Sequence, residues 1–322
     1  MSNVPTIEVI KAGPDDRIQD MGRFGYQHLG IPPSGVMDAH AASVANILLN
    51  NSASLPVIEL VLSFAKWRIL CRTYISTAGA EVEIMLNGKI QQVGQVFAVE
   101  KDDELQFSPS SRGARLYVAV QGGWRSEVWL GSASTDIWLN RGGHQGRRLQ
   151  SGDLLMAQAS FNLPEIFKRQ FYRCDYLPKH EVITTIRMIP APEFELWSKQ
   201  SNYTQNNISG KVTTQSNRMG YHVQLQRPIA HQHEMQSSPI TVGAIEWLPN
   251  GNWIVLMSDH PTTGGYPWIG TVITADLPRL AQITPASIVE WEWVDIDKAV
   301  QLLLEQRRNL QILQHAIHES FR

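Results

Sequence analysis

Four stretches of the sequence combine hydroxyl, carboxylate, amide or guanidinium side chains with glycine. They read QDMGRFGYQHLGIPPSGVMD (19–38), GSASTD (131–136), SNRMGY (216–221) and DHPTTGGYP (259–267). Glycine permits tight turns and lets a ligand approach the main chain closely. Polar loops carried on a rigid scaffold are typical of binding and catalytic sites, so we expect these loops to form one.

The first stretch supplies an acceptor and a donor close together. Asp20 lies three residues before Arg23, and Ser34 follows the stiff, extended Pro32-Pro33 pair. A carboxylate that accepts a proton and a guanidinium that donates hydrogen bonds would suit a polar substrate. Asp38, at the end of the stretch, is most simply the N-cap of a helix.

The second stretch offers Ser132, Ser134 and Thr135 as hydroxyl donors, followed by Asp136 as an acceptor or base. Small hydroxyl residues after a glycine also leave backbone N–H groups accessible, which suits an anion or an amide. The alternative is a turn closed by Ser and Thr side chains that only connects two strands. The loop by itself favours neither interpretation.

The third stretch places an amide, a guanidinium and a phenol within six residues, from Asn217 through Arg218 to Tyr221. Arg218 could clamp a carboxylate or phosphate with two parallel hydrogen bonds. The alternative is a buried arginine that donates to loop carbonyls.

In the fourth stretch, Thr262 and Thr263 precede Gly264 and Gly265, so a ligand could reach the backbone unobstructed. Tyr266 adds a ring for stacking and a hydroxyl. A long turn that ends in a proline-stiffened strand is the structural alternative.

Other chemistries lack their sequence patterns. The chain has no GxxxxGK[ST] phosphate loop, no GxSxG motif and no HExxH motif. His231 and His233 have no third ligand at a characteristic spacing, so we predict no metal site.

Composition narrows the class of protein further. The net charge is −2 over 322 residues, with 43% apolar and 18% charged residues, so a folded chain without a nucleic-acid partner is expected. The longest apolar runs are far too short for a membrane span, and the N-terminus lacks the pattern of a secretory signal. Cys71 and Cys174 show no metal or disulfide spacing, and we predict a cytoplasmic protein with two free thiols.

The elements that must position these loops are mostly strands. Alternating or β-branched runs such as 57–62, 81–86 and 115–120 predict short strands, and 287–294 predicts a half-buried one. Asn-Gly pairs at 87–88 and 250–251 predict hairpins with type I′ turns. Helices are predicted over 38–51 and over a long C-terminal segment, 295–321.

A change in composition near residues 157–182 interrupts this succession of strands and predicts a domain boundary. We assign residues 1–170 to an N-terminal domain and residues 171–322 to a C-terminal domain with the terminal helix. The predicted class is mainly β, with two barrel-like domains and few helices.

The loops, in this order, resemble one family. It includes the C subunit of prokaryotic 5-oxoprolinase, the second subunit of allophanate hydrolase, KipA, and the carboxyltransferase domain of urea amidolyase. The resemblance is carried by residues 19–38, 131–136, 142–153 (GGHQGRRLQSGD), 216–221 and 262–282, and it extends to about residue 295. It implies two cyclophilin-like β-barrel domains.

The resemblance also implies partners and a substrate class. It predicts a sister subunit, similar to the B subunit of 5-oxoprolinase, and a third protein, similar to its A subunit. Together they would convert 5-oxoproline to glutamate with ATP used at the level of the complex. Alternatives are a KipA-like protein that antagonises a kinase inhibitor, or carboxyl transfer from carboxybiotin to urea or another amide. The last would need a biotin carrier on another chain.

A small amide substrate would be polarised by donors while a carboxylate accepts its N–H proton. For catalysis we assign as donors Arg23, Arg218, Thr262 and Thr263, and as acceptor or base Asp20 or Asp136. The residues expected to bind substrate or cofactor are Ser34, Ser132, Ser134, Thr135, Asn217, Tyr221, Gly264, Gly265 and Tyr266.

Overall fold

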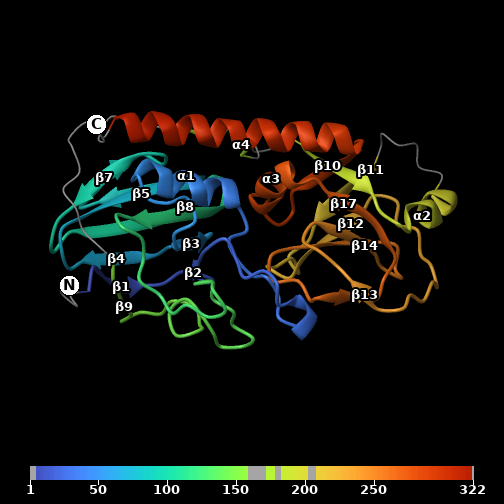
Figure 1. Ribbon diagram of the computed structural model, residues 1–322, viewed down its shortest axis with the longest axis horizontal. Helices are drawn as coiled ribbons and strands as arrows, with labels where there is room; N and C mark the ends of the chain where they lie inside the picture. Colours follow the sequence, from blue (N-terminus) through green and yellow to red (C-terminus); the bar gives the residue numbers. More distant parts are fainter. Residues whose placement is uncertain (1–4, 159–171, 178–182, 202–207, 321–322) are drawn as a thin grey trace. The chain divides into compact units, whose positions relative to one another are not determined.

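The chain forms two compact units, both mainly β (Figure 1). A computed structural model describes residues 5–158, 172–177, 183–201 and 208–320. The first unit comprises Met1–Arg23, Asp38–Leu177 and Arg308–Arg322, and the second comprises Phe24–Met37 and Pro178–Arg307. The predicted boundary between residues 170 and 171 lies outside the described residues. The predicted class, mainly β with few helices, is confirmed.

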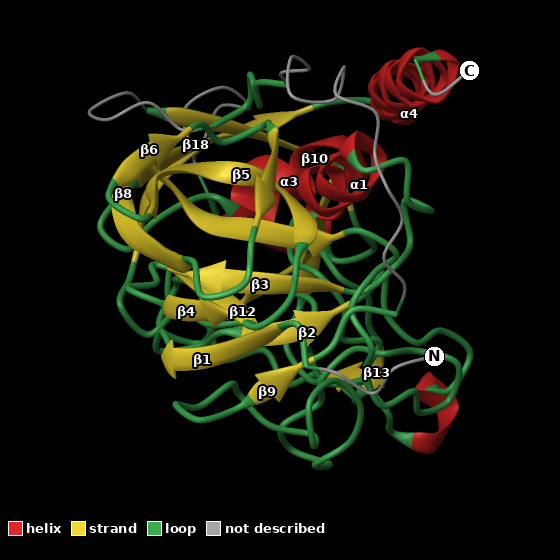
Figure 2. Cartoon of the chain, turned by 90° about the vertical axis from the view of Figure 1, so that its left-hand side faces the viewer, coloured by secondary structure: helices red, strands yellow, loops and turns green. Residues whose placement is uncertain are grey.

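A nine-stranded antiparallel sheet forms the first unit, in the order β2-β3-β8-β4-β1-β9, with β5 paired to β8, β6 and β7. The long strands β5 and β8 pair along most of their length, and the sheet curves into a half-barrel (Figure 2). The strands are β1 (Ile7–Lys11), β2 (Arg17–Gln19), β3 (Val57–Val61), β4 (Lys66–Ile69), β5 (Thr73–Leu86), β6 (Lys89–Gln91), β7 (Val96–Val99), β8 (Glu104–Val120) and β9 (Leu154–Leu155).

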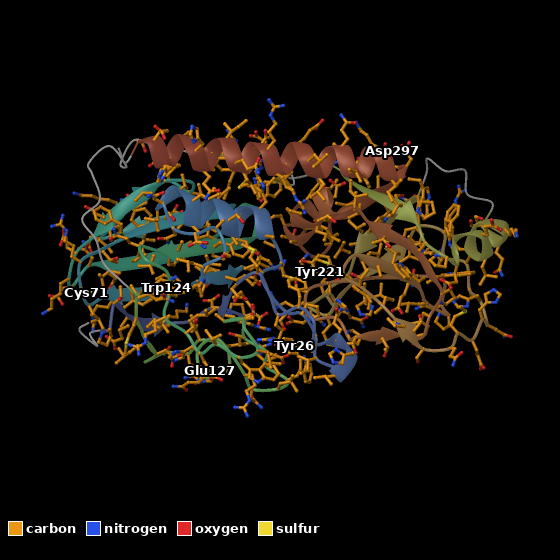
Figure 3. All side chains as sticks on the ribbon, viewed as in Figure 1. Tyr26, Cys71, Trp124, Glu127, Tyr221 and Asp297 are labelled. Carbon is orange, nitrogen blue, oxygen red and sulfur yellow. The ribbon has the colours of Figure 1, made fainter. Side chains whose placement is uncertain are left out.

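Helix α1 (Ala39–Leu48) packs against β5 and β8 and is buried along most of its length. Asp38 accepts a hydrogen bond from the Ala41 backbone N–H at 2.8 Å, which confirms the predicted N-cap. Within the sheet, Trp67 packs edge-on against Phe107 and Trp124. Trp124 is labelled in Figure 3.

The second unit contains a closed seven-stranded barrel in the order β10-β17-β14-β15-β12-β11-β18. Its core is rich in tryptophan, including Trp197, Trp247, Trp253 and Trp291. Strand β18 alternates exposed and buried residues, as predicted for 287–294. The barrel strands are β10 (Thr184–Pro190), β11 (Ile208–Val212), β12 (Gly220–Leu225), β14 (Ala244–Trp247), β15 (Trp253–Leu256), β17 (Trp268–Val272) and β18 (Ile288–Trp293). A separate ribbon pairs β13 (Ser238–Pro239) with β16 (Thr263–Gly264).

The two Asn-Gly pairs behave differently. Asn87 and Gly88 have φ of 49° and 77° and join β5 to β6 directly, so the predicted type I′ turn is confirmed. At the second pair only Gly251 has a positive φ, and the loop between paired Trp247 and Trp253 is longer. The hairpin prediction is therefore right, whereas the two-residue turn predicted there is wrong. Leu248 donates to Asn252, and Gly251 donates to Leu248, so these main-chain bonds fix a wider loop instead.

The remaining helices are short, apart from the last. They are α2 (Phe194–Gln200), α3 (Leu277–Ala281), the 3-10 turns η1 (Gln27–Leu29) and η3 (Thr274–Asp276), and α4 (Ile296–Glu319). The terminal helix confirms the prediction for 295–321 to within two residues at each end. Among the described residues, none of the helices combines the length and hydrophobicity needed to cross a bilayer.

Candidate functional site

In the first unit, the 131–136 loop is fastened to strand β2. The Thr135 hydroxyl and backbone N–H both donate to Ile18 O, and the Gln19 side-chain amide donates to Thr135 O at 3.2 Å. A second glycine-rich segment packs on the loop, because a Cβ at Gly143 would lie 1.9 Å from Thr135 Oγ1. The loop therefore has one well-determined shape.

Asp20 organises the same loop. Its Oδ1 accepts from the Ser132 and Ser134 hydroxyls at 2.6 Å each and from the Gly22 N–H at 2.9 Å. Its Oδ2 accepts from the Ala133 N–H at 2.6 Å. Four donors on one carboxylate stabilise the loop and occupy the oxygens that a proton acceptor would use.

Arg23 and Asp136 form a buried charged pair beside this loop. Arg23 is 1% exposed and Asp136 2% exposed, with Arg23 Nη1 lying 3.8 Å from Asp136 Oδ2. The guanidinium also donates to Ser134 O and stacks over the Trp129 ring at 5.0 Å. Asp136 Oδ1 accepts from the backbone N–H groups of the two residues at 138 and 139. The structure thus brings Asp20, Arg23 and the 131–136 loop together.

The hydroxyl groups of this loop point inward. Ser132, Ser134 and Thr135 are fully buried; the two serine hydroxyls donate to Asp20, and the Thr135 hydroxyl donates to Ile18 O of β2. Of the two interpretations that the sequence left open, the hydrogen bonds match the turn closed by Ser and Thr side chains.

In the second unit, Arg218 is held by Asp259. Arg218 Nε and Nη2 donate to the two carboxylate oxygens of Asp259 at 2.8 and 2.9 Å, and Nη2 also donates to Gly35 O at 2.5 Å. Both side chains are buried. This is the two-pronged geometry predicted for Arg218, with a carboxylate of the protein in place of a ligand. It joins three of the four predicted loops, because Gly35, Arg218 and Asp259 each belong to one.

The other predicted residues near Arg218 have local roles. Asn217 Oδ1 accepts from the Met219 N–H at 2.7 Å and shapes the turn that leads into β12. Tyr221 packs in the barrel core, where its hydroxyl donates to Ala281 O at 3.4 Å (Figure 3). Ser34 is buried with φ of 54°, in the same segment whose Val36 O accepts from the Ser258 hydroxyl at 3.2 Å.

The fourth loop presents its side chains to solvent. Thr263, Gly265 and Tyr266 are exposed and Thr262 is half-buried. Thr263 and Gly264 form β16, so pairing with β13 fixes the backbone beneath these side chains. Among the predicted catalytic donors in the described part of the chain, the two threonines are therefore the most accessible.

Three residues that were not among the predicted site residues support this loop. Asp259 anchors its start through Arg218. His260 is 1% exposed, its Nδ1 donates to Pro261 O at 2.6 Å, and burial lowers its pKa. Glu246 lies under Gly264, where a Cβ would be 2.1 Å from its Oε1. No local spacing predicts such contacts, although Asp259 and His260 lie within the fourth stretch.

Metal ligation receives no support from the described residues. Within them, no group of three or more His, Cys, Asp or Glu side chains is arranged to hold an ion. His231 Nε2 contacts Trp247 O, and its Nδ1 accepts from the His233 N–H. Both ring nitrogens of His231 therefore contact main-chain atoms, so the ring has a structural role in the loop.

Fold and loops together define a class: a mainly β protein of two units that carries polar, glycine-shaped loops on a barrel and a half-barrel. The chain belongs to the family described as carboxyltransferase domain, subdomain A and B, which its sequence matches over residues 29–293.

Two relatives each cover 98% of the chain. It is 32% identical over 319 residues to the C subunit of 5-oxoprolinase from Haemophilus influenzae, spanning 98% of this chain and 99% of that protein. It is 30% identical over 317 residues to the C subunit of 5-oxoprolinase from Escherichia coli, again spanning 98% and 99%. The crystal structure of K. lactis urea amidolyase matches 97% of this chain with a TM-score of 0.84 and 26% identity, and the chain corresponds to 20% of that longer polypeptide.

Proposed function

We propose that this protein is one subunit of an ATP-dependent 5-oxoprolinase, which opens the cyclic amide of 5-oxoproline to give glutamate. The observation that carries the proposal is the end-to-end similarity to two proteins named as the C subunit of 5-oxoprolinase. The chain would act with a sister protein similar to the B subunit of that enzyme and a third protein similar to its A subunit, with ATP used by the complex. We propose that it acts in the cytoplasm.

For the chemistry, we propose that the 262–266 loop contacts the amide. The hydroxyls of Thr262 and Thr263 would donate to the amide oxygen as negative charge develops there, and Tyr266 would stack on the ring of the substrate. The exposure of Thr263 and Tyr266 supports this assignment. Gly264 and Gly265 leave the backbone open to the ligand.

The buried charged groups would hold the polar loops of each unit in shape. We propose that Asp20 and Asp136 hold the 131–136 loop of the first unit, since Asp20 receives four hydrogen bonds and Asp136 is buried. Arg23 would position Asp136, because its Nη1 lies 3.8 Å from Asp136 Oδ2. For Arg218 we propose a positioning role, because its donors engage Asp259 and Gly35.

A reconstitution experiment tests the proposal. The chain is mixed with the two partner proteins, and ATP-dependent release of glutamate from 5-oxoproline is measured. Thr263→Ala should lower kcat/KM by about 10²-fold, the typical effect of removing one donor to a developing oxyanion. Thr214→Ala, at an exposed threonine in the same unit, is the matched control and should leave the rate unchanged. An unchanged rate in Thr263→Ala would refute the assigned role.

Carboxyl transfer is the second candidate, favoured by the TM-score of 0.84 with K. lactis urea amidolyase. It predicts that turnover requires a biotinylated carrier and is abolished by avidin. Glutamate release that is insensitive to avidin would exclude it. Absence of any turnover, together with an effect on a kinase inhibitor, would instead indicate a regulatory protein.

A further inference from the structure

Glu246 is a carboxyl group in the wall of an apolar barrel. It belongs to β14, whose four residues are all buried, and it is 5% exposed. Its neighbours in register are Ile254 on β15 and Trp268 on β17. A carboxylate in such surroundings is unstable unless donors or a cation compensate for the lost water.

The Glu246 carboxyl group contacts the 262–266 loop on the side of the loop that faces β14. A Cβ at Gly264 would lie 2.1 Å from Glu246 Oε1 and 2.9 Å from the Ile240 side chain, so a larger residue there would have to displace this oxygen. The Glu246 carboxyl also accepts a hydrogen bond from the Tyr266 backbone N–H. The Glu246 carboxyl group therefore contacts Gly264 and the Tyr266 backbone. Both belong to the loop whose solvent-facing side carries Thr263 and the Tyr266 ring.

Compensation for a negative charge is poor at this position. Glu246 Oε1 is buried and has no hydrogen-bond partner among the described residues. Burial raises the pKa of Glu246, and the Tyr266 N–H opposes this only in part. These two observations favour the protonated carboxyl group.

Among the described residues, the strands paired with β14 and the ribbon over Glu246 supply no cation. Strands β15 (WIVL) and β17 (WIGTV) contain no ionisable side chain, and neither does the β13–β16 ribbon that carries Gly264. The covering segments carry three ionisable groups, namely the Tyr266 phenol, His260 at the start of the loop, and Glu193, which accepts from the Trp268 N–H. None of these offers a positive charge at neutral pH, since burial lowers the pKa of His260.

We propose that Glu246 is a positioning residue for the 262–266 loop and that it supports the loop as a neutral carboxylic acid. Ionisation would place an uncompensated charge against the Gly264 main chain, and the loop would move outward to admit water. The consequence for activity rests on the proposed function, because it requires Thr263 and Tyr266 to contact the substrate. The inference about the conformation of the loop does not depend on the proposed function.

The structural part is tested on the isolated chain by hydrogen exchange of the 262–266 peptide, from mildly acidic to mildly alkaline pH, corrected for intrinsic exchange. Wild-type protection should fall as Glu246 ionises, by about tenfold or more. Glu246→Gln, which is nearly isosteric and cannot ionise, should retain protection throughout. Glu246→Ala should lose it at every pH. The control Glu290→Gln, at an exposed glutamate of β18, should follow wild type.

Wild-type protection that is flat with pH and equal to that of Glu246→Gln would overturn the inference. The functional part uses the reconstituted enzyme, where kcat/KM of wild type should decline on the alkaline side and Glu246→Gln should flatten that decline. An identical alkaline decline in both proteins would refute the link to activity. Complete inactivity of wild type would refute the proposed function while leaving the exchange result to decide the role of Glu246.

Discussion

Removing the carboxylate of Asp259 should destabilise the second unit more than any surface substitution. Arg218 and Asp259 are 3% and 7% exposed, and two hydrogen bonds of 2.8 and 2.9 Å join them. Asp259→Ala would remove the carboxylate that pairs with this buried guanidinium. Breaking such a pair from one side costs about 3–5 kcal/mol of unfolding free energy.

The expected loss of unfolding free energy is much larger for this buried pair than for an exposed ion pair in the same unit. Lys199 and Glu195 lie 3.2 Å apart on α2, with side chains 76% and 80% exposed. Glu195→Ala should therefore cost no more than about 0.5 kcal/mol. The double variant Arg218→Met/Asp259→Leu should cost much less than the sum of its single substitutions, because both charges of the pair are removed together.

Urea unfolding followed by pulsed hydrogen exchange is the appropriate assay, because peptides from β12 and β15 report on the second unit alone. A loss below about 1 kcal/mol in Asp259→Ala would refute the reasoning, as would strict additivity in the double variant. Either result would mean that water reaches the pair and that Arg218 is available for other contacts.

Three further predictions concern the first unit. Gly143→Ala should cost about 3 kcal/mol and loosen the 131–136 loop, because φ is +59° and the new Cβ would lie 1.9 Å from Thr135 Oγ1; the urea midpoint checks this. Gly88→Ala, at φ +77° with open space around it, should cost only about 1 kcal/mol in the same measurement. Burial raises the pKa of Asp16 to about 6, against hydrogen bonds that favour its ionised form. The stability associated with protonated Asp16 should be complete below its ordinary pKa of 3.8 and should fall by about 3 kcal/mol as pH rises through 6, as measured by unfolding of β3 peptides.

The order and type of many elements follow from neighbouring residues alone. Asp38 caps α1 because its side chain reaches an N–H group three residues ahead. Asn87-Gly88 forms its turn because both residues tolerate positive φ. At Asn250-Gly251 the same dipeptide lies in a wider loop, because pairing starts at Trp247 and Trp253 and leaves five residues to close the hairpin.

The roles of the polar loop residues were decided by contacts distant in sequence. Asp20 receives donors from a loop more than 110 residues away, and Arg218 meets its carboxylate 41 residues further along the chain. Sequence spacing identified these residues only as candidates for chemistry. Glycine-rich polar loops have the same sequence pattern whether their side chains face a ligand or one another.

By itself, the sequence determined the class of fold, the helix cap, one tight turn and the loops in which chemistry could occur. Only the tertiary structure decided which side chains face solvent, as Thr263 does, and which are buried and hydrogen-bonded within the protein, as Ser132 is. The physical reason is that local conformation depends on a few adjacent residues. Burial and hydrogen-bond partnership instead depend on how the barrel and half-barrel close, which brings Glu246 under Gly264 and Asp259 to Arg218.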